Sequence, residues 1–158
     1  MSPSENRPVR AGVLRDYPLR LWAEQEEYTQ DLLREFHLLL MGEQSGLLRE
    51  AAPGQLVVLA NLFQSRFGSI LQSINEERQA AHARGLDRMD SSIPLVEGTP
   101  ALLEQVRQVL TAADEFCRQG NLLLLPRPAH LVALSNWVHA ELVAQYDGGE
   151  PTPWPGPF

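Results

Sequence analysis

Histidine and cysteine are the side chains of this sequence that are best suited to holding a metal ion. The four histidines are His37, His82, His130 and His139, and Cys117 is the only cysteine. No two histidines stand four residues apart around a glutamate, and no Glu-x-x-His pair occurs, so the zinc-protease and di-iron bundle patterns are absent. Cys117 has no cysteine or histidine at metal-ligand spacing. We therefore predict no metal site and no cofactor.

Nucleophilic catalysis finds equally little support. The sequence contains no Gly-x-Ser-x-Gly, and no glycine-rich phosphate loop follows a predicted strand. Cys117 falls on the apolar stripe of a predicted helix, where a thiol is usually buried and inert. The sequence therefore predicts a protein that is not an enzyme.

Two clusters of charge could instead bind a partner. The acidic run from Glu24 to Glu35 could hold a cation or a basic protein, although a solvated helix face explains it more simply. Arg78, Arg84 and Arg88, with His82 among them, could grip a carboxylate-rich partner or simply form a solvated helix end. We keep the three arginines as candidate partner-binding residues.

Trp154 is the fourth candidate partner-binding residue. It stands between prolines in the tail over 149–158, outside any predicted helix. An exposed indole is unfavourable in water, so Trp154 either folds back onto the rest of the chain or anchors a partner in polyproline II form. Folding back is the simpler interpretation.

Apolar residues recur at helical spacing in four stretches that must position these side chains. One helix is predicted from Asp16-Tyr17-Pro18 to Gly42, and a second from Gln55 to about Gly85. A third runs from Thr99-Pro100 to Gly120, and a fourth from about Pro128 to Asp147. Thr, Asp and Pro are typical helix starts, and Gly is typical beyond a helix end.

The connections carry two further patterns. Leu122 to Leu125 has no polar position, which favours a joint buried between helices, with a short strand or a docking edge as alternatives. Ser91 to Val96 is predicted to be an extended strap, since Pro94 disfavours helix at the residue before it.

These elements predict an all-α protein, an antiparallel four-helix bundle with an extended strap and a proline-rich C-terminal tail. We expect a flexible leader over 1–15, a bundle domain over 16–148 and the tail over 149–158.

The composition limits the partners and the compartment. The formal net charge of −7 disfavours nucleic acid and anionic membranes as partners, because both require a basic surface. No stretch approaches transmembrane length, and residues 1–12 lack the apolar core of a signal peptide. With no possible intrachain disulfide, a cytoplasmic protein is expected.

The segments Leu32–Phe36, Ala113–Leu123 and Pro151–Trp154 resemble a family of small, uncharacterised actinobacterial proteins. Members of that family occur among partner-switching regulators, with ATP-binding anti-sigma kinases, STAS-domain antagonists and phosphatases. The resemblance implies an accessory role in signalling and assigns no site residue.

We therefore expect a non-enzymatic regulatory or protein-interaction module. The resemblance implies sigma-factor partner-switching signalling as its setting. A homodimer is a further expectation, because an apolar seam repeats with heptad-like spacing at Phe63, Phe67, Ile70 and Ile74. The alternative is a small-molecule sensor with a ligand between the helices. Its pocket would be lined by Trp22, Tyr28, Phe36, Phe116 and Trp137.

Overall fold

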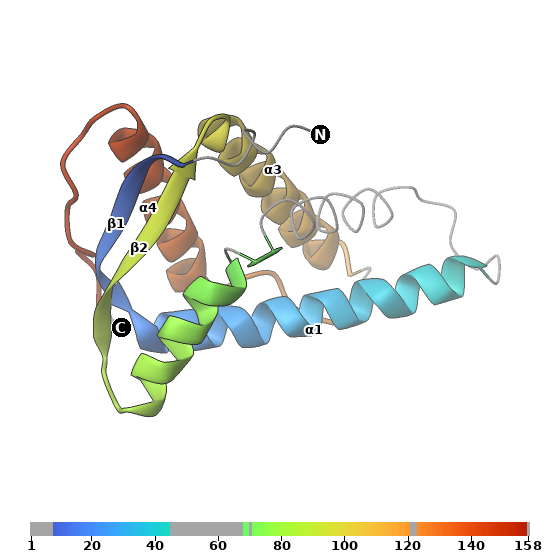
Figure 1. The fold of residues 1–158 in the computed structure, drawn as a ribbon. Helices are drawn as coiled ribbons and strands as arrows, with labels where there is room; N and C mark the ends of the chain where they lie inside the picture. Colours follow the sequence, from blue (N-terminus) through green and yellow to red (C-terminus); the bar gives the residue numbers. More distant parts are fainter. Residues whose placement is uncertain (1–7, 45–67, 70, 121–122, 158) are drawn as a thin grey trace.

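The computed structural model describes residues 8–44, 68–69, 71–120 and 123–157 (Figure 1). The chain runs through β1 (Pro8–Pro18), α1 (Leu19–Gln44), a helix over residues 71–83, β2 (Arg88–Val96), α3 (Thr99–Arg118) and α4 (Ala129–Tyr146). The described residues thus form four helices and one two-stranded sheet.

The sheet contradicts the prediction of an all-α bundle. β1 and β2 pair in antiparallel orientation, with Gly12 opposite Ile93, Val13 opposite Ser92 and Leu14 opposite Ser91. The fold is therefore mixed, with helices packed around a β-ribbon. The prediction failed because the partner that makes each segment a strand lies far away in the sequence.

β1 occupies sequence that was expected to belong to a flexible leader. From residue 8 onward the chain is extended and paired, although it contains few large apolar groups. Residues 1–7 lie outside the described residues. β2 includes the predicted extended strap over 91–96. This segment is a strand paired with β1, and it does not cross a helical bundle as an unpaired connection.

The helices begin close to the predicted residues. α1 follows Pro18 directly, and α3 begins at Thr99 after Gly98, whose φ of 85° favours glycine. The predicted second helix is helical over 68–69 and 71–83 and ends in a turn at residues 84–85, and residues 55–67 and 70 of the prediction lie outside the described residues. The same holds for Phe63, Phe67 and Ile70 of the proposed dimer seam, while Ile74 is buried.

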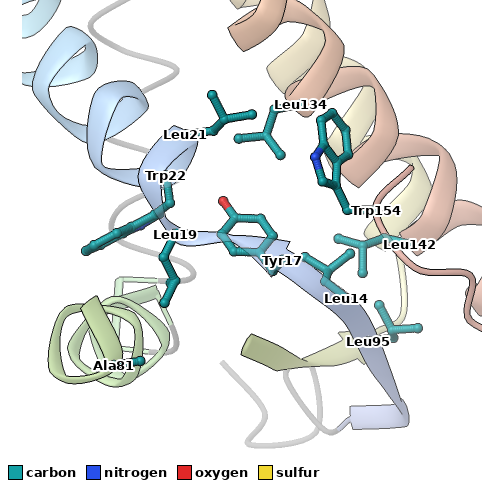
Figure 2. Packing of buried hydrophobic residues seen from close by; sticks show 10 residues of the cluster. All are labelled: Leu14, Tyr17, Leu19, Leu21, Trp22, Ala81, Leu95, Leu134, Leu142 and Trp154. Atoms are coloured by element: carbon teal, nitrogen blue, oxygen red, sulfur yellow. The ribbon is translucent and has the colours of Figure 1, made fainter. Parts of the chain in front are cut away.

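The main core lies where α1 leaves the sheet. It gathers buried side chains from both strands, from three helices and from the C-terminal tail (Figure 2). They are Leu14, Tyr17, Leu19, Leu21, Trp22, Ala81, Leu95, Leu134, Leu142 and Trp154. Further along α1, a smaller cluster joins Leu32 to Ala113, Phe116 and Cys117 of α3. The long α1 therefore packs against both clusters.

The outer edge of β1 is closed by a side chain. Gln145 of α4 accepts a hydrogen bond from the Val13 N–H through Oε1 and donates one to the Val13 carbonyl through Nε2, both at 2.8 Å. Its amide thus makes the two bonds that a neighbouring strand would make. One step along, the Trp154 N–H donates to the Arg15 carbonyl at 3.0 Å. Backbone groups that would otherwise be left unpaired at the edge are satisfied in this way.

We predict that Gln145→Leu lowers the free energy of unfolding by about 1–3 kcal/mol, because it leaves two backbone groups of Val13 without partners in a buried setting. Gln145 is 5% exposed. The measurement is urea denaturation followed by circular dichroism. Gln79→Leu, at an exposed position on the 71–83 helix, is the control and should change stability by less than about 0.5 kcal/mol. Equal stability of the two variants would contradict the edge role of Gln145.

Candidate functional site

The α3–α4 connection carries the most exposed large apolar side chains among the described residues. Leu123 is 96% exposed and Leu125 is 78% exposed. Leu124 between them is half-buried and packs against the α1–α3 cluster. The prediction of a wholly buried joint is therefore wrong for Leu123 and Leu125. Leu122 lies outside the described residues.

Two side chains of α1 hold the backbone of this connection. The Leu124 N–H donates to Glu35 Oε2 at 3.2 Å, and the Tyr28 hydroxyl donates to the Leu125 carbonyl at 2.7 Å. The exposed leucines thus project from a backbone that is anchored at Leu124 and at Leu125. An anchored loop loses less conformational entropy on binding than a free one.

A buried ion pair fixes the end of the connection. Arg127 donates from Nε and Nη2 to the Asp114 carboxylate of α3, at 3.1 Å and 2.9 Å, and each side chain is only 7% exposed. The backbone N–H of Arg127 donates to the same carboxylate, and Arg127 Nη1 donates to Ser135 Oγ of α4 at 3.1 Å. One arginine therefore ties α3, the connection and α4 together.

Cys117 is buried on α3, three residues after Asp114. Its Sγ is 3.9 Å from the Tyr28 hydroxyl. Burial has the largest effect and raises the pKa of the Cys117 thiol, the Tyr28 hydrogen bond opposes it, and the Asp114 and Glu35 carboxylates each raise it by less. Burial also raises the pKa of the Tyr28 hydroxyl. Both groups are protonated at neutral pH, so this pair supplies neither a nucleophile nor a base.

One acid–base pair faces solvent near the start of α4. His130 Nε2 is 2.6 Å from Glu24 Oε2, and the side chains are 50% and 45% exposed. A pair this exposed has no surrounding wall that could exclude water from a substrate. Among the described residues, no group of three or more His, Cys, Asp and Glu side chains could hold a metal ion.

The predicted partner-binding residues are mostly engaged within the chain. Arg78 lies over the Tyr17 ring, with Cζ 4.1 Å from the centroid, and donates to Ser91 Oγ from Nε and Nη2 at 3.2 Å each. Arg88 donates to the Gly156 carbonyl at 3.4 Å. Arg84 is exposed.

Trp154 is buried and takes the folded-back position. It is 7% exposed and lies in the main core (Figure 2). It meets the Trp137 ring edge-on, with centroids 5.3 Å apart and planes at 73°. Its indole Nε1 donates to the Pro157 carbonyl at 3.2 Å. In this arrangement Trp154 is not available as an exposed anchor.

The residues expected to line a ligand pocket are divided between two clusters. Trp22 and Trp137 belong to the main core, whereas Tyr28 and Phe116 belong to the α1–α3 cluster. The side chain of Phe36 lies outside what the structure describes. An open depression of about 390 Å³ lies elsewhere. Its lining mixes polar and apolar surface and consists of Ser69, Ser73, Ile74, Glu77, Ser92 and Pro94.

Sequence reasoning missed the residues that brace the connection. The helical pattern gives no reason to expect a buried aspartate at Asp114, yet only 5% of the residue is exposed. The available signal was Arg127, a long cation held between two prolines with no counter-charge nearby in the sequence. Only the packing of α3 against α4 identifies Asp114 as its partner.

Comparison of this chain with protein families, with curated proteins and with solved structures finds no match in any of the three. The resemblance to actinobacterial regulators therefore stays a prediction. None of the helices that the structure describes has the length and apolar character needed to cross a bilayer.

We predict that Asp114→Asn lowers the free energy of unfolding by about 3–5 kcal/mol, because it leaves Arg127 buried without its counter-charge. The adjacent exposed pair provides the control. Glu115 and Arg118 are each 57% exposed, so Glu115→Gln should cost less than about 0.5 kcal/mol. Urea denaturation of both variants makes the measurement, and similar costs would show that Asp114 is not a brace.

We also predict slow labelling of Cys117 by an aromatic disulfide reagent in the folded chain at neutral pH. A raised thiol pKa means that the thiolate fraction grows only as the pH rises, so the rate should still be increasing between about pH 7 and about pH 9. Chain unfolded in urea is the control and should react much faster. Fast, pH-independent labelling of the native chain would identify Cys117 as an activated thiol instead.

Proposed function

We propose that this chain is a non-enzymatic regulatory module that binds another protein through Leu123 and Leu125. The observation that carries the proposal is the 96% and 78% exposure of these two leucines on an anchored connection. Burying two large apolar side chains that stand in water favours association, and a connection that is already anchored loses little conformational entropy when it binds.

The chemistry of the surface suggests what such a partner offers. Two leucines separated by one residue fit an apolar pocket that accepts both side chains. The formal net charge of −7 favours a basic rim around that pocket, because complementary charge speeds association and excludes other acidic proteins. Nucleic acid and anionic membranes do not fit this combination.

The resemblance to accessory proteins of partner-switching systems suggests the biological setting. We propose that the protein partner is a regulator of a partner-switching system in the cytoplasm. A second copy of this chain is the other occupant that the leucine pair could accept, which would give a homodimer.

The test is affinity capture from host extract with the tagged full-length chain and with Leu123→Ser/Leu125→Ser. We expect the double variant to recover a partner at least about tenfold less well, since two central apolar contacts are lost. Leu86→Ser is the matched control, because Leu86 is 45% exposed and lies outside the connection. Circular dichroism should show all three chains folded.

Equal capture by the double variant and the control would overturn the docking role of the leucines. Static light scattering distinguishes the two occupants. A concentration-dependent dimer that disappears in the double variant would identify a second copy of the chain as the partner.

A further inference from the structure

The C-terminal tail is held against the rest of the chain by a few discrete contacts. Residues 149–157 contain no helix or strand. The tail leaves α4 through Gly148, whose φ of 98° favours glycine, and returns along β1 to bury Trp154 (Figure 1). Because no regular element runs through it, the tail can lift away without breaking a helix or the β1–β2 pairing.

Thr152 makes the polar contact between this tail and α4. Its backbone N–H donates to Glu141 Oε2 at 3.2 Å, and its hydroxyl donates to Glu141 Oε1. Glu141 is only 9% exposed, and its Oε2 also accepts from Gln145 Nε2 at 3.0 Å. The Thr152 contact is thus continuous with the amide that closes the edge of β1.

The sequence offers an internal comparison for Thr152, because it contains two Thr-Pro dipeptides. Thr99 is 8% exposed, and its hydroxyl donates to the Val96 carbonyl in the turn between β2 and α3. Thr152, in contrast, is an exposed residue in a proline-rich segment without regular structure, although its hydroxyl is bonded to Glu141. Protein kinases bind their substrates as extended segments, so the two threonines differ in access while sharing the dipeptide.

We propose that Thr152 is a phosphorylation site for a Thr-Pro-directed protein kinase, and that phosphorylation releases the C-terminal tail. In the reaction the γ-phosphorus of a nucleoside triphosphate forms a bond to Thr152 Oγ1, and its bond to the bridging β,γ-oxygen breaks. The hydroxyl proton passes to the aspartate of the kinase's catalytic loop, and nucleoside diphosphate is the second product. The proposal does not depend on the docking role of Leu123 and Leu125.

Electrostatics gives the reason for release. Burial disfavours ionisation of Glu141, but hydrogen bonds from Thr152 and Gln145 outweigh it and lower the pKa of this carboxyl. Glu141 is therefore ionised at neutral pH. A phosphate on Thr152 carries about −1.5 to −2 charge and replaces a donor with acceptors, so attraction becomes repulsion at a poorly hydrated site.

Release would change which surface the protein presents. Trp154 would leave Trp137, and the Arg15 carbonyl at the outer edge of β1 would lose its partner. An aromatic surface and part of a strand edge would then be open to another chain. The kinase would capture the lifted tail, and the phosphate would prevent its return.

The first experiment treats the full-length chain with a purified Thr-Pro-directed kinase and magnesium ATP, and maps phosphate by mass spectrometry. The background is Ser2→Ala, which removes the one Ser-Pro dipeptide. We expect one phosphate on Thr152, none on Thr99, and none on Thr152→Val. A synthetic peptide of residues 147–158 is the positive control. A peptide that is phosphorylated while Thr152 of the folded chain is not would overturn the site.

The second experiment measures hydrogen exchange of the tail amides in the phosphorylated and unphosphorylated full-length chains. The Thr152 and Trp154 amides both donate hydrogen bonds, so their exchange should become about tenfold faster or more on phosphorylation, with a red shift in tryptophan emission. The amides of β2 opposite Gly12 and Leu14 should not change. Unchanged protection of the tail amides in the phosphorylated chain would overturn the release.

Discussion

The pairing of β1 with β2 is the constraint on which the rest of the structure depends. A two-stranded ribbon is only marginally stable alone, and here helices and the tail complete it. Gln145 makes the two hydrogen bonds to Val13 that a third strand would make, and Trp154 makes one to Arg15. Because Gln145 belongs to α4 and Trp154 to the tail, these hydrogen bonds fix the positions of α4 and of the C-terminal tail against β1.

The same principle of satisfied polar groups organises the other end of the helices. Arg127 is enclosed with Asp114 and Ser135, so the α3–α4 connection has one well-defined course. A buried charge pair of this kind contributes more to specifying a conformation than to net stability, because its desolvation offsets much of its attraction. Here the Asp114–Arg127 pair specifies the path of the α3–α4 connection, from which Leu123 and Leu125 project into water.

The two regions give the molecule surfaces of different character. Leu123 and Leu125 are exposed on an anchored loop, whereas Trp137 and Trp154 pack against each other, with Trp154 in a tail that has no regular structure. Under the two proposals above, the leucine pair is open to a partner in the folded chain, and the aromatic pair becomes open only after the tail is released.

The sequence by itself determined the helices, because apolar spacing and the Pro and Gly signals at helix ends are local properties. It therefore placed the starts of α1, α3 and α4 near Pro18, Thr99 and Pro128. It could not determine that residues 8–18 form a strand, since their hydrogen-bonding partner, β2, lies far away in the sequence. Nor could it show that Asp114 is buried or that Leu123 and Leu125 are exposed. Burial along Leu123–Leu125 is decided by which neighbours α1 and α3 supply, and that is a property of the tertiary structure alone.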